Sequence, residues 1–276
     1  MAEEQENIHM QKLGGLCFSV GREPHIVSPA LRTVAKDTHA IRTYGNEPYY
    51  REAISHGLSI VPGAWIGEDD SIHKIALDEL IETAHAFRPR LVIVGNETQL
   101  FNRVSADTLI KHLRYVKARV PKCTLVTTAE DAKLLLQKPE IMHACDVIGM
   151  HYYPFWHGVP IEHAVSDFDS MYRSVRLIGN YKEIVVLETG WPSDGGTHSW
   201  DTPHGIRHSS VATMESAVRY FHELMSWSYR MGVQVFWFEA FNELWKVQFE
   251  GLPGAHWGLR ACPQSPRKYW PQVVAA

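Results

Sequence analysis

The stretch that decides the fold is Ile184-Val185-Val186-Leu187-Glu188-Thr189-Gly190-Trp191-Pro192-Ser193. Its first four residues are aliphatic, and such a short continuous run is typical of a buried strand in a parallel sheet. Gly190 and Pro192 then interrupt the pattern, so Glu188 lies where the strand gives way to a loop. A carboxylate in this position is costly unless it is paired or used in chemistry. For an isolated glutamate, a structural salt bridge would be the simplest interpretation.

A second stretch has the same arrangement 91 residues earlier in the chain. It reads Leu91-Val92-Ile93-Val94-Gly95-Asn96-Glu97, again a buried strand that ends in a glutamate. Because the carboxyl ends of parallel strands meet at one edge of a sheet, we expect Glu97 and Glu188 to lie close together. Glycoside hydrolysis uses such a pair, with one carboxyl group as acid and base and the other as nucleophile or base.

Strand-like and helix-like segments alternate along the rest of the chain. Eight runs are typical of strands, and each of the first seven is followed by a segment with apolar residues at helical spacing. One helix is expected from about Ser28, with Pro29 in its first turn, and a long one from about Ser209 to Tyr229, with Val211 on its apolar face. The predicted strands are 13–19, 40–45, 59–65, 91–97, 124–128, 146–152, 184–188 and 232–239.

This regularity favours a (β/α)8 TIM barrel over a doubly wound sheet. A doubly wound fold rarely reaches eight regular units, and no G-x-G-x-x-G phosphate loop follows the first strand. The length of 276 residues also suits one barrel. We therefore predict a single catalytic domain over residues 11–276, preceded by a disordered tag or linker over residues 1–10.

Composition excludes several classes of function. The formal net charge is −4 and there is no basic run, so we expect no nucleic-acid partner. No apolar run approaches the roughly 20 residues of a membrane span, so we expect no transmembrane segment. Aromatic residues make up 11% of the chain, including nine tryptophans, which is more than packing alone requires. Exposed aromatic rings often mark surfaces that stack on sugars.

The cysteines and the N-terminus bear on the compartment. The four cysteines show neither C-x-x-C spacing nor a metal pattern. Cys17, Cys123 and Cys145 lie in or beside predicted strands, so we expect small buried hydrophobes and no disulfide. Residues 1–10 lack a signal-peptide core, so the chain could be a domain cut from a larger membrane or secreted protein. We expect a monomer.

Polar and aromatic residues gather at the predicted carboxyl ends of the strands, where the active site of a barrel lies. Three of the carboxylates among them stand at strand ends, which is more than a purely structural barrel needs. The set comprises Tyr44, Trp65, Asn96, Glu97, His151, Tyr152, Tyr153, Glu188, Trp191, Glu239, Glu243 and Lys246.

Several of these motifs resemble a known family. Leu187-Glu188-Thr189-Gly190-Trp191-Pro192-Ser193 resembles the nucleophile signature of glycoside hydrolase family 17, the β-1,3-glucanases and their glucanosyltransferase relatives. Val94-Gly95-Asn96-Glu97 resembles the acid/base segment of the same family. The resemblance extends in the same order along most of the barrel, through residues 42–44, 153–155, 236–243 and 256–259.

The resemblance implies a retaining double displacement on β-1,3-glucan. Glu188 would be the nucleophile and Glu97 the acid and base, while Asn96 would bind the sugar 2-hydroxyl. Tyr44 and Tyr153 would hold that sugar and the nucleophile. Glu239, Glu243 and Lys246 match a family cluster that supports the site, although a structural salt bridge among them is an equal alternative. Trp191 and Trp237 could stack on glucose or pack at the barrel mouth.

No cofactor or metal is expected. His198, His204 and His208 share one loop, but their irregular spacing and the absence of nearby cysteines favour solvated histidines. The family's usual tyrosine-containing motif after strand 1 is replaced by residues 18–22, which leaves contacts in that corner undefined.

The outcome for the glycosyl-enzyme is open, because hydrolysis and glucanosyl transfer share the same intermediate. The chain is as short as compact fungal and bacterial relatives, and we expect appreciable transfer. Aromatic candidates for acceptor contacts are Phe155, Trp156, Trp191 and Trp245. A β-1,4-active glycosidase is a weaker alternative, because its relatives usually place Pro where Thr98 stands, and a non-catalytic glucan-binding barrel is weaker still. By resemblance, an extracytoplasmic location is expected.

Overall fold

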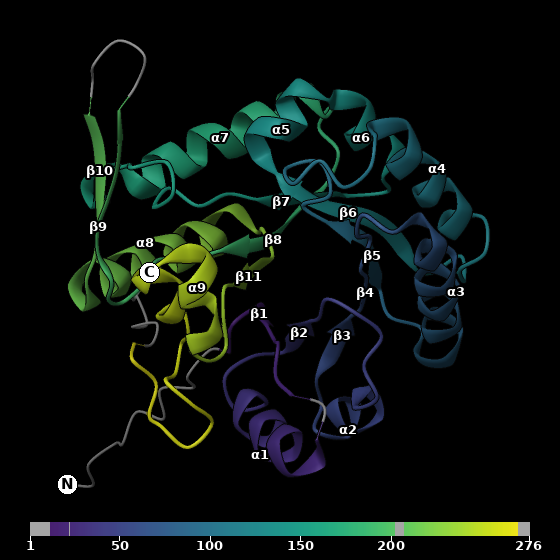
Figure 1. The fold of residues 1–276 in the computed structure, drawn as a ribbon, viewed down its shortest axis with the longest axis horizontal. Helices are drawn as coiled ribbons and strands as arrows, with labels where there is room; N and C mark the ends of the chain where they lie inside the picture. The colour runs from purple at the N-terminus through teal and green to yellow at the C-terminus, as the bar shows by residue number, and fades with distance from the viewer. Residues whose placement is uncertain (1–11, 22, 202–206, 270–276) are drawn as a thin grey trace, which may run out of the picture.

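The computed structural model describes residues 12–21, 23–201 and 207–269. The predicted tag or linker over residues 1–10 lies outside these ranges, and its boundary stays a prediction. Figure 1 shows the strands of one large sheet gathered at the centre of the molecule with helices around them. No helix in the described part of the chain is long and apolar enough to cross a membrane.

The central sheet is parallel and nearly closed. Its strand order is β3-β2-β1-β11-β8-β7-β6-β5-β4, and β3 and β4 are two halves of one stretch that Pro62 divides. Pro62 has no N–H to donate, but its carbonyl oxygen accepts from Ile93 N at 3.0 Å. The strands are β1 Gly15–Cys17, β2 Ala40–Arg42, β3 Ser59–Val61, β4 Gly63–Ala64, β5 Leu91–Asn96, β6 Leu125–Asp131, β7 Ile148–His151, β8 Ile184–Thr189 and β11 Val235–Trp237.

Helices follow the strands around the barrel, as the alternation predicts. They are α1 Pro24–Val34, α2 Tyr50–Ser55, α3 Asp70–Phe87, α4 Ala106–Lys117, α5 Ala132–Gln137, α6 Pro139–Ala144, α7 Ala164–Ile178, α8 Met214–Met231 and α9 Val247–Glu250, with 3-10 turns η1 Ile161–His163, η2 Leu244–Lys246 and η3 Leu252–Ala255. With β3 and β4 counted as one strand, the described residues form the predicted (β/α)8 barrel.

Two apolar layers hold the barrel together. The larger lies between sheet and helices and includes Val92, Val94 and Val186. The smaller fills the barrel itself and includes Ile93 and Val185. Adjacent residues of one strand therefore face opposite layers, which explains why the central strands are continuously apolar.

An antiparallel hairpin, which the sequence did not predict, follows β8. It consists of β9 Gly196–Asp201 and β10 Arg207–Ala212, and it replaces the first turn of the helix expected from Ser209. The helix α8 instead begins after Thr213, whose Oγ1 accepts from Ser216 N at 3.1 Å as an N-cap. Val211 is thus an exposed strand residue, and its predicted place on a helical face is wrong.

Two smaller expectations are also wrong. Helix α1 begins at Pro24, not near Ser28, because Pro24 occupies the first helical turn, where no N–H is needed. Pro29 consequently lies inside that helix. Cys123 is exposed, because it lies in the turn before β6, whereas Cys17 and Cys145 are buried as expected.

Candidate active site

The strand that carries Glu188 contains an irregularity just before it. Strand β8 has one extra residue between Val186 and Thr189 relative to β11, and one between Val186 and Glu188 relative to β7. A bulge of this kind re-aims the side chains that follow it. Leu187 packs inside the barrel, and the bulge lets the adjacent Glu188 face the cavity at the strand ends as well.

Strand β5 has a matching irregularity before Glu97. It contains one extra residue between Ile93 and Asn96 relative to β6. Gly95 has a φ of +78°, and a Cβ there would lie 2.6 Å from Thr98 Cγ2, so glycine is required. Glu97 itself has a φ of 49°, an uncommon conformation for a residue other than glycine. This turn brings Asn96 and Glu97 to the same cavity.

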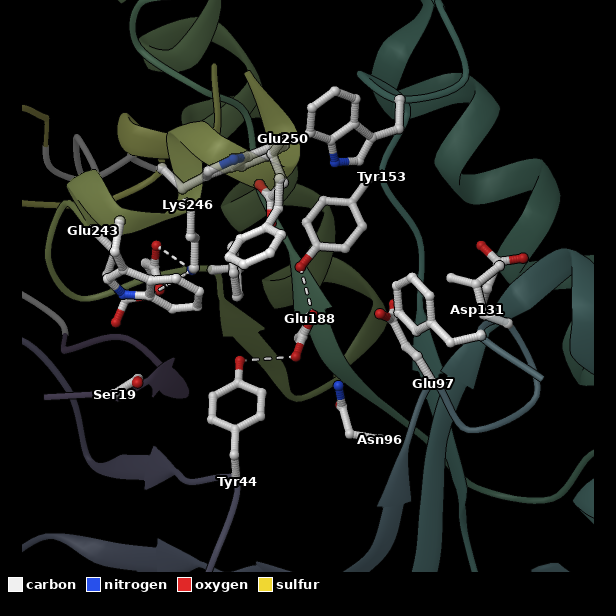
Figure 2. A pocket seen from close by; sticks show the side chains of 18 of the residues that line it. Ser19, Tyr44, Asn96, Glu97, Asp131, Tyr153, Glu188, Glu243, Lys246 and Glu250 are labelled. Carbon is white, nitrogen blue, oxygen red and sulfur yellow. Dashed lines mark hydrogen bonds and ion pairs between the residues drawn. The ribbon is translucent and has the colours of Figure 1, made fainter. Parts of the chain in front are cut away.

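Glu188 is buried and held from three directions. Arg42, at the end of β2, forms an ion pair with Glu188 Oε1. The hydroxyl of Tyr44 donates to the same oxygen at 2.8 Å, and the hydroxyl of Tyr153 donates to Oε2 at 2.7 Å. Figure 2 shows the two tyrosines reaching Glu188 from opposite sides. The carboxylate is therefore fixed in orientation before any substrate arrives.

These partners also set the charge of Glu188. Burial opposes its ionisation, but the electrostatic interactions with His151 and Arg42 outweigh burial. With the hydroxyls of Tyr153 and Tyr44, they lower the pKa of Glu188 to about 2. Burial raises the pKa of both tyrosines, so they keep their protons and donate. Glu188 is thus an ionised carboxylate at neutral pH, as a nucleophile requires.

Glu97 lies beside Glu188, with His151 between them. His151 Nδ1 is 3.1 Å from Glu97 Oε1 and 3.4 Å from Glu188 Oε2. One oxygen of each carboxylate and this nitrogen all lie within 4.8 Å of one another. Glu97 is partly exposed, whereas His151 is fully buried. The two carboxylates therefore form the close pair that the sequence predicts.

Arg42 links Glu188 to Asn96. Its guanidinium donates to Asn96 Oδ1 as well as to Glu188. With its oxygen engaged by Arg42, Asn96 has its amide nitrogen available as a donor, and Figure 2 shows this nitrogen directed towards Glu188 and the cavity. Asn96 is thus placed to donate to a ligand hydroxyl close to the carboxylate pair.

Tyr44, Asn96, Glu97, Tyr153 and Glu188 form the floor of an open cavity of about 830 Å³. Its volume is that of a site for a small molecule or a few sugar units. The lining comprises Ser19, Tyr44, Trp65, Asn96, Glu97, Leu100, Phe101, Arg103, Asp131, Tyr153, Trp156, His157, Glu188, His198, Phe238, Glu239, Glu243, Trp245, Lys246, Phe249, Glu250 and Trp257.

The cavity has two walls on opposite sides of Glu188. Figure 2 shows Glu97 and Asp131 on one side and Ser19, Glu243 and Lys246 on the other. We name them the Glu97 wall and the Lys246 wall. The Glu97 wall comprises Glu97, Phe101, Arg103, Trp65, Asp131 and His157, since Phe101 N donates to Glu97 O, Arg103 lies over the rings of Phe101 and Trp65, and His157 lies beside Asp131. The Lys246 wall comprises Ser19, Glu239, Glu243, Trp245, Lys246, Phe249 and Glu250, in which Lys246 contacts Glu239, Glu243 and Trp245, and Phe249 packs on Trp245.

A buried ion cluster anchors the Lys246 wall. Lys246 Nζ lies 2.8 and 2.7 Å from the two oxygens of Glu239 and 2.7 Å from Glu243 Oε2. Burial raises the pKa of Glu239 even though Lys246 opposes that shift. The structural salt bridge among Glu239, Glu243 and Lys246 is therefore present. All three residues also line the cavity, so this salt bridge lies where a cluster supporting the site was the alternative expectation.

Three aromatic residues expected near the ligand do not reach the cavity. Trp191 and Trp237 are fully buried, and Trp191 Nε1 donates to Val211 O at 2.9 Å. Phe155 is fully buried as well. None of the three lines the cavity, so their assignment as ligand contacts is wrong, and the packing alternative for the tryptophans holds. Trp156 and Trp245 do line it.

Arg42 and His151 contact the carboxylate pair, a role that sequence reasoning does not assign to them. Arg42 belongs to the family-like run 42–44, and a basic residue inside a buried strand was a usable signal. His151 ends a strand, but nothing in the sequence shows that it lies between Glu97 and Glu188. That contact depends on the pairing of β7 with β8.

The expected absence of a metal requirement stays a prediction. His198 Nε2 lies 3.1 Å from Trp156 O, so it has a partner in the protein. His204 and the side chain of His208 lie outside the described part of the structure. Among the described residues, Glu97, His151 and Glu188 have the geometry to bind a cation, but Arg42 and two tyrosine hydroxyls already occupy Glu188.

Known proteins are similar to this chain in sequence. Probable glucan endo-1,3-beta-glucosidase btgC of Aspergillus clavatus is 25% identical over 260 residues, which cover 85% of this chain and 37% of that protein. Glucan 1,3-beta-glucosidase of Arthroderma benhamiae is 27% identical over 231 residues, 78% of this chain and 72% of that protein. This chain thus spans well under half the length of the btgC relative.

The barrel is also similar to solved structures. An active-site mutant of Rhizomucor miehei beta-1,3-glucanosyltransferase in complex with laminaritriose aligns with a TM-score of 0.79 at 21% identity, over 95% of this chain and 98% of that one. At that identity the likeness supports the TIM-barrel fold. The family model of the BtgE/BtgC glycoside hydrolase domain matches residues 22–258. Because this match includes most of the barrel and both strand-end glutamates, the chain belongs to the BtgE/BtgC glycoside hydrolase domain family.

Proposed function

We propose that this chain is a retaining enzyme of glycoside hydrolase family 17 that acts on β-1,3-glucan. The observation that carries the proposal is the carboxylate pair, since an oxygen of Glu97 and one of Glu188 lie within 4.8 Å at the cavity floor. Retaining glycosidases hold their two carboxyl groups about 5–5.5 Å apart, whereas inverting enzymes need roughly 6.5–9.5 Å. The names of the relatives support the β-1,3-glucan substrate.

The first half of the reaction forms a covalent intermediate. The ionised Glu188 attacks the anomeric carbon of the sugar, and the bond from that carbon to the glycosidic oxygen breaks. Glu97 donates its proton to that oxygen, so the leaving chain departs as an alcohol. Arg42, Tyr44 and Tyr153 hold Glu188 in position for this attack.

The second half releases the enzyme. Glu97, now a carboxylate, removes a proton from water or from a sugar hydroxyl, whose oxygen then attacks the anomeric carbon and displaces Glu188. Water gives hydrolysis, and a sugar hydroxyl gives glucanosyl transfer. Asn96 is placed to hydrogen-bond a hydroxyl of the sugar next to the anomeric carbon, an interaction that strengthens in the transition state of such enzymes.

Transfer is favoured by the open Glu97 wall. Its rings and polar groups can hold an acceptor next to the intermediate, which gives the acceptor a large effective concentration relative to free water. Incubation with laminaripentaose, followed by mass analysis, should therefore give products longer than the substrate at high oligosaccharide concentration. If all products were shorter than the substrate at every concentration, the enzyme would be a hydrolase without transfer activity.

The catalytic assignment is tested by substitution. Glu97→Gln and Glu188→Gln should each lower turnover of laminaripentaose by at least about 10³-fold while the circular dichroism spectrum is unchanged. Glu183→Gln, which alters an exposed ion pair with Arg90, should retain full activity. With an aryl glucoside donor, azide should rescue Glu188→Ala and yield an α-glycosyl azide, whereas Glu97→Ala should yield the β-anomer.

Two alternatives are decided by the same assays. Faster turnover of cellopentaose than of laminaripentaose would favour a β-1,4-active glycosidase. Binding of glucan without turnover would favour a non-catalytic barrel. Both carboxylates are present and correctly spaced, which argues against the second alternative.

A further inference from the structure

The segment after β11 exposes large apolar side chains beside the cavity. Trp245 is 57% exposed and Phe249 is 74% exposed, although tryptophan and phenylalanine are usually well buried. Both line the cavity. Their rings lie 6.1 Å apart in an edge-to-face arrangement, which makes one continuous aromatic surface. Two adjoining exposed rings that line a cavity are a candidate surface for a ligand.

This aromatic surface stands on a fixed base. Lys246, between the two rings in sequence, is buried and bound to Glu239 and Glu243. Its Nζ also lies 5.7 Å from the Trp245 ring centroid. Because the backbone under the rings is held by a buried ion cluster, the rings are presented to the cavity at little further cost in conformational entropy when a ligand binds.

The position of Glu97 shows which part of a substrate would meet this surface. In a retaining reaction the acid/base group contacts the oxygen between the attacked sugar and the leaving group. The leaving group therefore lies towards Glu97 and the Glu97 wall. Lys246 lies on the opposite side of Glu188 (Figure 2). Trp245 and Phe249 lie on the same wall, because Lys246 Nζ is 5.7 Å from the Trp245 ring centroid and the two rings are 6.1 Å apart. Both rings therefore lie on the side of the glycone, the part of the chain that is transferred to Glu188, and Trp245 is placed on the donor side instead of making the acceptor contact that the sequence suggested.

We propose that Trp245 and Phe249 form a platform for glucose units of the glycone beyond the attacked sugar, so that the enzyme selects donors by glycone length. This inference rests on the proposed function. The C–H-bearing face of a β-linked glucose can pack on such rings, while its hydroxyls meet the carboxyl groups of Glu243 and Glu250 on the same wall.

A sugar chain fits this surface better than a membrane does. The two rings line a cavity, and carboxyl groups line the same wall. The chain also carries a net charge of −4, and anionic lipid surfaces attract basic segments. The occupant is therefore a neutral ligand with both apolar and hydroxyl-bearing faces.

Aryl β-laminari-oligosides with one, two or three glucose units isolate the glycone side when release of the aryl alcohol is followed, because in that cleavage the aryl group is the leaving group and lies on the Glu97 side. For the unaltered protein, kcat/KM should rise with glycone length. Trp245→Ala and Phe249→Ala should each reduce kcat/KM for the longest glycone on the order of tenfold and leave that for the monoglucoside within about twofold. Tyr229→Ala, which removes an aromatic ring of 75% exposure on α8, is the matched control and should change neither.

The outcomes separate this inference from the proposed function. No turnover of any laminari-oligoside or laminaripentaose by the unaltered protein would overturn the proposed function. Normal turnover with an unchanged dependence on glycone length in both alanine variants would overturn the platform alone. The platform would also fail if the variants lost only sedimentation with phosphatidylcholine–phosphatidylserine vesicles, since the surface would then bind a membrane.

Discussion

His151 has its Nδ1 3.1 Å from Glu97 Oε1 and 3.4 Å from Glu188 Oε2, and it is fully buried. A polar group fixed between two reacting carboxylates supports their orientation and charge, and removing such a preorganised group typically costs a large factor in rate. We therefore expect His151→Phe, which preserves a ring of similar size, to lower kcat by about 10²-fold. His151→Asn can return a donor near Nδ1 and should lose much less.

The comparison of these two variants identifies the role of His151. Steady-state kinetics with laminaripentaose and thermal unfolding would be measured for both. If the role of His151 were purely structural, substitution would lower the melting temperature, but the two variants would not differ in kcat. Equal losses of kcat in the two variants would contradict an effect through the Nδ1 position.

Trp191 is a second residue whose role can be tested. It is buried, and its indole donates to Val211 O at 2.9 Å in the β9–β10 hairpin. Trp191→Phe removes that hydrogen bond and some packing, and should lower the free energy of unfolding by about 1–2 kcal/mol. KM should not change. Trp65→Phe, at a cavity-lining ring, should do the reverse by raising KM with little effect on stability. A raised KM in Trp191→Phe would show that Trp191 contacts the ligand and that its assignment to packing alone is wrong.

At the level of elements, the parallel strands and their helices could be predicted because their signals are local. Buried strands that end at the site are predicted by the aliphatic runs at 91–94 and 184–187 and by the break in the pattern at Gly190. The bulges in β5 and β8 could not be predicted in the same way, since a bulge is a mismatch between two paired strands. Only Gly95 gave a hint, as a lone glycine at a strand end.

The hairpin after β8 was missed for a related reason. Its strand β10 has polar and apolar residues that also fit the start of a helix, and only pairing with β9 decides between them. The position of the tryptophans was equally hard to predict. Trp191 lies two residues after a strand, and whether its ring turns into the cavity or into the packing under the hairpin depends on Phe155 in a turn, Val211 in β10 and Tyr220 in α8.

Gly95→Ala tests the bulge in β5. The substitution places a Cβ 2.6 Å from Thr98 Cγ2 at a backbone φ of +78°. Gly57 has the same φ of +78°, but a methyl group added there would have no atom within 4 Å, so Gly57→Ala reports the conformational cost alone. We expect Gly57→Ala to cost about 1 kcal/mol of stability and to keep full activity. Gly95→Ala should cost more and should lower kcat at least tenfold, because Asn96 and Glu97 follow directly. Equal activity of the two variants would show that the bulge does not aim these side chains.

For the whole molecule, the site exists only when the barrel is closed. Arg42, Glu97, His151 and Glu188 come from β2, the end of β5, β7 and β8, and each contacts another across the strand ends. The ionised state of Glu188 is therefore a property of the folded chain, and its stabilisation contributes to the free energy of unfolding.

The pH dependence of stability follows from this link. The pKa of Glu188 is lowered from an ordinary value of 4.5 to about 2 in the folded protein. A group with a depressed folded pKa contributes stability that is fully present above its unfolded pKa and is lost as the pH falls through its folded pKa. We therefore expect Glu188 to make the free energy of unfolding decrease between about pH 4.5 and pH 2, by on the order of 3 kcal/mol. Denaturant unfolding at a series of pH values would measure this slope.

Comparison with Glu188→Gln isolates the contribution of that one group, because the amide cannot titrate. The variant should show a smaller loss of stability on acidification than the unaltered protein, whatever its stability at pH 7. Glu183→Gln is the control, since its exposed ion pair with Arg90 is expected to contribute less than about 1 kcal/mol and its slope should match that of the unaltered protein. If Glu188→Gln and the unaltered protein lost stability in parallel between pH 4.5 and pH 2, Glu188 would titrate alike in the folded and unfolded chains. The ion pair with Arg42 and the two tyrosine hydrogen bonds would then not hold the nucleophile ionised, and that part of the mechanism would have to be abandoned.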